Sequence, residues 1–524
     1  MTNMGTTGRD KEISWFCKRY ENSNRREKGE LLSEIENRFL VSRRRAKRLM
    51  IGDLCSEAER KTKTGKIGRP SKYQDKALAS TTNGALYIPA GKYVINSRLN
   101  MNKSNFVLRG AGQGETILYF PKSLETVVGF RDWQNPLPGQ MIWGNGSGGL
   151  IWIGSAAESG WPAFGPSLAL VTTPASKGSS VLTLNKTSGL AVGQYVVLRQ
   201  ADDVNKTLWQ YLHGDLISPN DLNPSDAYYW PVKIKAISGN AITLNQPLLF
   251  DVRTQWSPGL YTYTPVVKEV GIENLTIEFP DIPYEGHHDE PGYNGFAFLD
   301  SLNCWMRNVE VKNADNAGSI GRLSKNVTIL NLALKSRTQG SYIDNFGGYS
   351  GHHGIYVKSM ASNNMVSNLD FKGTFIHEIS VDAKANGNVF RASQGEDISF
   401  DHHSYSPFAN LFSDINVGEG SRPWYSSGNP DVFKSGAWEV FWNIHTNKGQ
   451  FVKSLPWWEP RSSVVPSQES NWPSDPLDRW GEIMPSITPR DLYLSQFKKR
   501  TGYDSYLYSP PSAPSAPKNL RVVQ

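Results

Sequence analysis

Ionisable side chains gather in one window of the chain, between residues 352 and 403, where five of the nine histidines fall. Three phrases in this window share one pattern, in which apolar, variable, apolar and charged residues follow one another: Ile355–Lys358, Ile379–Asp382 and Ile398–Asp401. Because alternate residues of a strand face opposite sides, each phrase buries its two apolar residues and turns the charged one outward. We therefore expect Lys358, Asp382 and Asp401 to form one outward column, flanked by histidines.

Residue types of this kind carry out proton transfer. In β-elimination, a base removes the proton beside a carboxylate while a cation neutralises that carboxylate. In glycoside hydrolysis, a protonated acid assists the leaving group while a second carboxylate activates water or attacks. Strands of a sheet lie about 4.8 Å apart, so carboxylates on adjacent strands suit the retaining spacing. The candidate catalytic residues are His353, Lys358, His377, Asp382, Lys384, Arg391, Asp401, His402 and His403.

Metal binding ranks below direct acid–base chemistry on the sequence. Histidine and aspartate are ordinary zinc ligands, but no recognised ligand spacing is present. We therefore expect no metal ligand set and no required cofactor, although the carboxylates are compatible with Ca²⁺.

Net charge divides the chain into two unlike parts. Residues 1–75 contain 19 Lys and Arg against 11 Asp and Glu, whereas the remaining residues are almost neutral. The net charge of +7 therefore belongs to the first segment and says nothing about a substrate of the rest. No stretch approaches the roughly twenty apolar residues of a membrane helix, and no signal peptide is visible.

The basic segment, residues 1–78, is predicted to be helical over residues 10–52, where apolar residues recur at helical spacing. It ends in Gly68-Arg-Pro-Ser-Lys-Tyr73. Small basic helices before such a phrase resemble the N-terminal region of insertion-sequence transposases. The resemblance implies salt-sensitive binding of duplex DNA, and the alternative is a fusion remnant without function.

Short strands dominate from residue 79 onward. Alternating runs around Ser238-Gly-Asn240 indicate an inserted antiparallel subdomain over residues 175–250. From residue 271, an asparagine precedes each short strand, at Asn274, 308, 331, 368, 388 and 410, with spacings of 34, 23, 37, 20 and 22 residues. Such spacings are typical of one coil of a β-solenoid. We therefore expect an all-β, right-handed parallel β-helix over residues 79–508, in which each asparagine bonds to the backbone of the next coil.

Two phrases carry a family resemblance: Leu86-Tyr-Ile-Pro-Ala-Gly-Lys-Tyr-Val94 and Val107-Leu-Arg-Gly-Ala-Gly-Gln-Gly114. They resemble the pectate-lyase-like, polygalacturonase-related β-helix superfamily, over roughly residues 80–450. The resemblance implies polysaccharide cleavage outside the cell by a monomer, or glycan binding as in tailspikes and adhesins. It specifies the fold better than the reaction.

The catalytic pattern of polygalacturonases is not retained. Gly351-His-His-Gly354 only approximates its Gly-His-Gly element, and its Asp-Asp pair and Arg-Ile-Lys phrase are missing. We therefore transfer no catalytic residue from that family. Because basic groups outnumber acids in the window, we expect a lyase acting on a uronate-containing glycan. A hydrolase using Asp382 and Asp401 is the first alternative, and a non-catalytic glycan-binding solenoid is the second.

The segment over residues 421–508 is rich in aromatics and loops. Because sugar rings stack on aromatic faces, we expect substrate binding by Arg422, Trp424 and Tyr425 of this segment and by Tyr405 and Glu419, which precede it. The final segment, residues 509–524, is a proline-rich linker that resembles the start of a fibronectin-type-III-like module. Cys304 is predicted to be a buried structural thiol.

Overall fold

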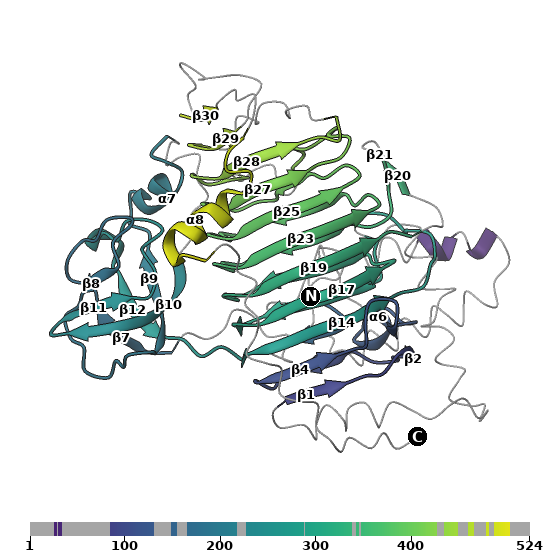
Figure 1. Cartoon of the computed structure of the whole chain (residues 1–524), viewed down its shortest axis with the longest axis horizontal. Helices are drawn as coiled ribbons and strands as arrows, with labels where there is room; N and C mark the ends of the chain where they lie inside the picture. Colours follow the sequence, from purple (N-terminus) through teal and green to yellow (C-terminus); the bar gives the residue numbers. More distant parts are fainter. Residues whose placement is uncertain are drawn as a thin grey trace.

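The chain is described by a computed structural model over residues 26–28, 30–33, 84–129, 148–154, 165–216, 227–287, 289–337, 342–344, 347–426, 434–448, 460–465, 478–481 and 487–503. Most of these residues form a parallel β-helix, in which strands of successive coils lie side by side (Figure 1). The predicted all-β solenoid is therefore confirmed.

The larger sheet of the β-helix has thirteen strands in the described part of the chain, and their neighbours are parallel. Its main path is β1 (Gly84–Tyr87), β4 (Phe106–Arg109), β14 (Val270–Glu278), β17 (Trp305–Lys312), β19 (Thr328–Lys335), β23 (Met365–Lys372), β25 (Val389–Gly395), β27 (Leu411–Asn416), β28 (Val440–His445), β29 (Ser463–Val465) and β30 (Trp480–Gly481), with β2 (Gly91–Val94) and β5 (Thr116–Tyr119) beside it.

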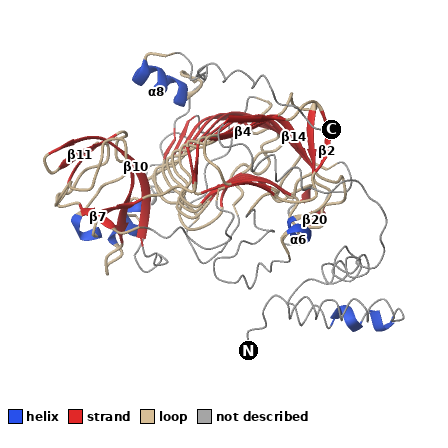
Figure 2. Ribbon diagram, turned by 90° about the horizontal axis from the view of Figure 1, so that it is seen from below, coloured by secondary structure: helices blue, strands red, loops and turns tan. Residues whose placement is uncertain are grey.

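The second sheet has seven parallel strands within the described residues and forms the opposite layer (Figure 2). Its order is β26 (Phe400–His402), β24 (His377–Val381), β22 (His353–Val357), β18 (Asn316–Gly321), β15 (Asn294–Leu299), β6 (Ile151–Ile153) and β3 (Leu99–Met101). The histidine-rich window therefore lies at one end of this sheet.

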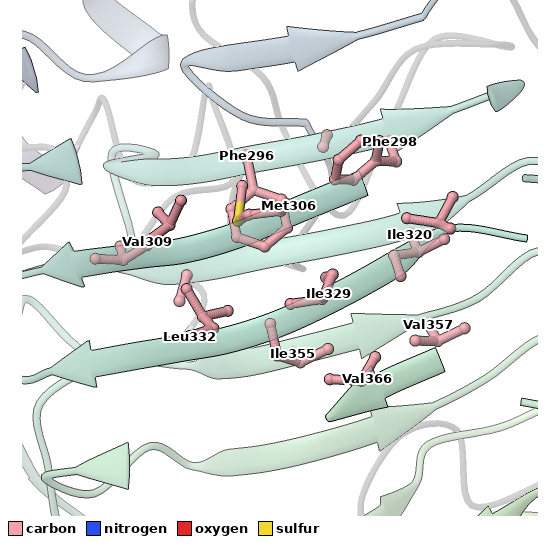
Figure 3. Packing of buried hydrophobic residues seen from close by; sticks show 14 of the residues in the cluster. Phe296, Phe298, Met306, Val309, Ile320, Ile329, Leu332, Ile355, Val357 and Val366 are labelled. Carbon is pink, nitrogen blue, oxygen red and sulfur yellow. The ribbon is translucent and has the colours of Figure 1, made fainter. Parts of the chain in front are cut away.

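Apolar side chains from both layers fill the interior between them. Each coil contributes residues to the same stacks, as Figure 3 shows for Phe298, Ile320 and Val357 from the second sheet and for Val309 and Leu332 from the first. Because every coil buries its apolar residues against both neighbouring coils, the core runs the length of the solenoid.

Two asparagine ladders run along the first sheet, and the repeat predicted from the sequence combined members of both in one series. Asn274, Asn308, Asn331 and Asn368 lie within strands at φ near +55°, a left-handed bend that asparagine tolerates. Their side chains bond to one another along the outside, for example Asn331 Nδ2 to Asn308 Oδ1 at 2.8 Å. The expectation that these four bond to the next coil's backbone was therefore wrong, since they bond side chain to side chain.

A separate, buried ladder precedes the strands, and it does reach the backbone. Its members are Asn364, Asn388 and Asn410, and the buried Glu439 ends it. The Asn388 carboxamide oxygen accepts from the Asn364 backbone N–H at 3.1 Å, and Asn410 does the same for Asn388 at 3.0 Å. The position equivalent to Asn368 on the next coil is Ala392, not Asn388.

An antiparallel sheet of six strands projects from the solenoid, at the left of Figure 1. Its strands are β7 (Ser167–Leu170), β12 (Gly259–Thr262), β9 (Tyr195–Ala201), β10 (Ala227–Ser238), β11 (Ala241–Leu244) and β8 (Val181–Thr183), in that order. The inserted sheet is confirmed, but β7 and β12 extend it beyond residues 175–250. Its separate apolar core includes Trp230 and Trp256.

The remaining elements are short. They are β13 (Val267–Lys268) with β16 (Ser301–Leu302), the hairpin of β20 (Tyr342–Asp344) and β21 (Gly347–Tyr349), α6 (Leu124–Val127), α7 (Thr207–Leu212), a 3₁₀ turn at Thr254–Trp256 and α8 (Leu492–Thr501). Within the described residues, no helix is long and apolar enough to cross a bilayer. Apart from helical residues 26–28 and 30–33, the basic segment lies outside the described residues, as do residues 509–524.

Cys304 is buried, as predicted, and burial raises the pKa of its thiol to about 12. A thiol held in this protonated state is a poor nucleophile.

The buried ladder makes a stability prediction. Asn388→Ala leaves the buried N–H of Asn364 without its acceptor, at a cost of about 1–3 kcal/mol for each such group. The matched control is Asn331→Gly, which removes a rung of the exposed ladder but keeps the left-handed backbone. We expect denaturant titration to show a clear loss of unfolding free energy for Asn388→Ala and a loss within about 1 kcal/mol for the control. Equal losses would contradict the assigned role of the buried ladder.

Candidate functional site

The register of β22, β24 and β26 sets the geometry of the site. Ile355 pairs with Ile379, and Ile379 pairs with Phe400, so Ser380 stands beside Asp401. The predicted column of Lys358, Asp382 and Asp401 was therefore wrong at its last member. In the phrase Ile398–Asp401, the second apolar residue, Phe400, fills the core position that Ile355 and Ile379, the first apolar residues, fill in the other two phrases.

Two outward columns result from this register. One contains Tyr356, Ser380 and Asp401. The other column lies two residues further along each strand and contains Lys358, Asp382 and His403. Its register is set by two backbone hydrogen bonds, in which the N–H of Asp382 donates to the Val357 carbonyl and the N–H of His403 donates to the Val381 carbonyl. We call this second set the outer column.

Lys358 and Asp382 of the outer column meet at Tyr356. The Tyr356 hydroxyl donates to Asp382 Oδ2 at 2.5 Å, and Lys358 Nζ lies 4.3 Å above the centre of the phenol ring. Burial lowers the pKa of Lys358 to about 8, although Asp382 opposes this shift. Burial raises the pKa of Asp382, and burial together with the Asp382 charge raises that of Tyr356 well above its usual value.

His403 is held by a buried carboxylate. Its Nδ1 lies 2.9 Å from Asp401 Oδ2, and the Asp401 side chain is fully buried. Burial works against the protonated form of His403, but the charges of Asp401 and Asp382 outweigh it and raise the pKa. The outer column thus contains an imidazole that favours its cationic form and an amine that loses its proton unusually easily.

Buried imidazoles lie behind the outer column. His353 stacks between the rings of Tyr356 at 4.3 Å and His352 at 4.2 Å, and its Nδ1 is 3.0 Å from Ser380 Oγ. His377 lies 5.0 Å from His353, ring to ring, and its Nδ1 is 3.5 Å from Asp401 Oδ2. Burial lowers the pKa of both His353 and His377 well below the usual value, so both are neutral at neutral pH.

His287 and Glu290, both from the loop between β14 and β15, contact the cluster at His352. His287 from this loop lies edge-on to His352, with ring centres 4.5 Å apart. Glu290 Oε1 is 3.0 Å from His352 Nδ1 and accepts a hydrogen bond from the Tyr284 hydroxyl at 2.5 Å. Burial raises the pKa of Glu290 to about 8.

Two residue groups bring metal-ligating atoms together. His287, His352 and His377 form one group, and His377, Asp401 and His403 form the other. In each group, one ligand atom from every residue lies within 4.8 Å of the others. The expectation of no ligand set followed from the sequence spacing, which does not reveal that His287 joins the cluster.

The predicted substrate-binding residues have different surroundings. Tyr425 stacks on His377 with ring centres 5.7 Å apart, and Tyr405 is exposed at the edge of the site. Trp424 instead packs on Phe400 and Phe441 at the edge of the core.

Arg422 and Glu419 hold loops in place. The guanidinium of Arg422 donates to the Ile376 and Phe375 carbonyls and to Glu378 Oε1. The backbone N–H of Glu419 donates to the Glu396 carbonyl, and its side chain is exposed.

Three predicted catalytic residues lie away from the cluster. Arg391 is on β25 of the larger sheet, where its Nε donates to Asp491 at 2.6 Å, just before α8. The Lys384 ammonium lies 4.9 Å above the ring of Trp209, which is in α7. His402 faces the interior, between Phe412 and Phe441. In the doublet His402-His403, strand alternation therefore leaves one imidazole in the core and one at the site.

Sequence reasoning missed several residues that complete the site. Tyr356 occupies the variable position of its phrase, and the repeat predicts no residue type at that position. Lys434 lies close enough for the Asp401 and Asp382 charges to act on its pKa, which burial lowers. The Gly286-His-His288 doublet was the one available signal for His287, since it repeats the doublet at His352-His353.

No protein-family model matches the chain, and no curated protein matches it. Similar solved structures include the tailspike protein of Pseudomonas phage LKA1, with 12% identity and a TM-score of 0.48, covering 75% of this chain and 56% of that one. A tailspike of Acinetobacter baumannii bacteriophage AP22, in complex with capsular saccharide, has 11% identity and a TM-score of 0.29, covering 79% and 68%. Pectin methylesterase from Erwinia chrysanthemi has 9% identity and a TM-score of 0.32, covering 75% and 90%.

This chain therefore aligns with little more than half the length of the first of these structures. At such identities and TM-scores, the likeness says nothing about a reaction or a substrate. No match supports the transposase resemblance of residues 1–78.

The Asp401–His403 pair makes a pKa prediction. In Asp401→Asn the carboxylate charge is lost while burial remains, so the pKa of His403 falls. Histidine NMR titration measures this shift, with Asp370→Asn on the other sheet as the control. Because the folded pKa of His403 is raised, its stabilising effect is full below the unfolded value of about 6.5 and is lost as pH rises through the folded pKa. An unchanged His403 pKa in Asp401→Asn would contradict the pairing.

Proposed function

We propose that this protein cleaves a polysaccharide by β-elimination at a uronic acid residue, using the outer column. The observation that carries the proposal is the pair of opposite pKa shifts within that column. Lys358 loses its proton at about pH 8, while His403 is driven toward its cationic form. Elimination needs both functions at once, a base for one proton and a cation for the carboxylate beside it.

In this mechanism His403 binds the uronate carboxylate. The imidazolium can donate through the nitrogen that does not face Asp401, and the buried Asp401 charge keeps the ring protonated and oriented. Neutralising the substrate carboxylate lowers the cost of carbanion formation at the adjacent carbon. The negative charge that develops there then stands beside a fixed positive charge.

Lys358 in its neutral form takes the proton from C5 of the uronate. Electrons of the C5–H bond form the C4=C5 double bond, and the C4–O4 bond breaks with its electrons on the leaving oxygen. Tyr356 then supplies the proton for that oxygen, since its raised pKa keeps the hydroxyl protonated. Asp382, which accepts that hydroxyl hydrogen and interacts with Lys358, returns the proton from the ammonium to the phenol.

The surroundings of the column are suited to this chemistry. Charged groups are largely buried there, so their interactions are stronger than they would be in water. Tyr425 and the exposed Tyr405 add aromatic surface at the rim, where sugar rings can stack. These proton transfers need no cofactor. We propose that the protein acts as a monomer on a polysaccharide outside the cell.

Hydrolysis is the alternative that one observation favours. Burial raises the pKa of Asp382, as a general acid requires. However, Asp401 is offset from Asp382 by two residues along the adjacent strand. Their Cα atoms are therefore separated by about 8 Å, whereas directly paired positions on adjacent strands are about 4.8 Å apart.

Product analysis separates the three functions. A lyase creates an unsaturated uronate, which absorbs ultraviolet light, whereas a hydrolase creates reducing ends without that absorbance. A glycan-binding solenoid creates neither and retains only affinity.

We predict that Lys358→Met lowers kcat on a uronate polymer by about 10²–10⁴-fold, the usual contribution of a general base. Lys358→Arg keeps the positive charge but not the neutral amine, so it should not restore the rate. The matched control is Lys372→Met, an exposed lysine paired with Asp370 on the other sheet. Screening the full chain on alginate, pectate, glucuronan and neutral glycans by ultraviolet absorbance provides the measurement. Lyase activity that survives Lys358→Met would rule out this base.

The pH–rate profile should be bell-shaped. The active form has a neutral Lys358, whose pKa is about 8, and a protonated His403, whose pKa is raised, so each group sets one limb. In Asp401→Asn the limb that His403 sets should move to lower pH, because the His403 cation is no longer stabilised. Two limbs that both stay in place would show that another group is the required acid.

A further inference from the structure

We infer that His287, His352 and His377 bind one divalent transition-metal ion of the Zn²⁺ class. This site lies beside the outer column and shares none of its residues. Binding therefore does not depend on the proposed elimination. It also goes beyond the sequence, which showed no ligand spacing because residue 287 is 65 positions from residue 352.

The three imidazoles converge from separate parts of the chain. His352 directly precedes β22, His377 begins β24, and His287 comes from the loop between β14 and β15. Their ring centres are 4.5 Å apart for His287 and His352, 5.5 Å for His352 and His377, and 6.5 Å for His287 and His377. One nitrogen from each ring lies within 4.8 Å of the other two. Nitrogens on one Zn²⁺ are about 3.4 Å apart, so small rotations of the rings complete the set.

Glu290 supports this assignment because it orients one of the rings. Its carboxylate lies 3.0 Å from His352 Nδ1, and the Tyr284 hydroxyl fixes the carboxylate in turn. When Nδ1 carries the proton toward Glu290, Nε2 presents its lone pair to a metal. A carboxylate behind a ligating histidine is the usual outer partner in zinc sites.

The loop that carries His287 and Glu290 is anchored to the β-helix. The backbone N–H groups of Gly292 and Tyr293 donate to Asp315 Oδ2 at 3.0 and 2.7 Å. Asp315 is also paired with the buried Arg337. The C-terminal end of the loop that carries His287 is therefore held in place, which reduces the entropy cost of assembling the ligands.

Three imidazole ligands favour zinc, copper, nickel and cobalt over calcium or magnesium, which prefer oxygen ligands. A three-histidine set also leaves a fourth position for water or a substrate oxygen, as in catalytic zinc sites. The ring of His377 lies 5.4 Å from that of His403 in the outer column, so under the proposed function an oxygen of a bound glycan is the expected occupant of that position.

The test is metal binding by the full chain without an affinity tag, after chelator treatment and without any substrate. Zinc is titrated by calorimetry, and cobalt is titrated by visible absorption, whose band intensity reports four-coordinate geometry. We expect one ion per chain, and loss of that ion in His287→Ala and in His352→Ala. Glu290→Gln should weaken binding by about 10–100-fold. The matched control is His445→Ala, which alters a half-buried histidine on β28 and should bind as the parent does.

Several outcomes would overturn the inference. They are an absence of stoichiometric binding, cobalt bands of six-coordinate intensity, or full binding retained by His287→Ala, which would place the ion elsewhere, for example on Cys17 or Cys55. His287 is on a partly exposed loop, so its variant remains decisive if His352→Ala fails to fold. Because no glycan is present, loss of binding is distinguishable from failure of the proposed elimination.

Discussion

The register between parallel strands is the constraint on which the site depends. A shift of β26 by two residues would keep every apolar residue in the core and still bring a different set of polar groups together. Two features exclude that shift. Phe400 packs with Phe412 and Phe441 in the interior, and the Asn364–Asn388–Asn410 ladder connects each coil to the next by side-chain and backbone bonds. The outer column of Lys358, Asp382 and His403 exists because this register is held.

Burial then gives these groups their chemical character. Removing water penalises every charge in the cluster, so each ionised group needs a partner. His403 lies 2.9 Å from Asp401, and its pKa rises, whereas burial outweighs the Asp401 charge at His377 and lowers the pKa of both His353 and His377. One set of desolvated side chains therefore contains an imidazole with a raised pKa, a lysine with a lowered pKa, and neutral imidazoles. These separate states arise from neighbours only a few ångströms apart.

The sequence predicted the fold well and the site only in part, and the reason is physical. Apolar alternation and asparagine spacing report what each coil does locally, so the solenoid and the inserted antiparallel sheet followed from them. Contacts between coils depend on the register between their strands. The repeated phrases are equally compatible with two registers that differ by two residues. For that reason Asp401 was predicted in the column of Asp382, although it pairs with Ser380, and Asn388 was assigned to the wrong ladder. His402 shows the same limit, because a doublet does not say which ring faces the core.

Loops were the second source of error. Arg391 and Lys384 have suitable chemistry, but their partners are Asp491, directly before α8, and Trp209, in α7. His287 and Glu290 reach the cluster from a loop whose path no pattern in the sequence predicts. Tyr356 could not be selected either, since its position in the phrase is variable and only the structure shows its bond to Asp382.

The central claim is that the outer column performs the reaction on a uronate. A crystal structure of the Lys358→Met variant with a uronic-acid oligosaccharide tests this claim most directly. The account predicts a uronate carboxylate within hydrogen-bonding distance of His403, with its C5–H directed at the side chain of residue 358 and O4 near the Tyr356 hydroxyl. An oligosaccharide bound on another face, or one whose carboxylate points away from His403, would contradict it.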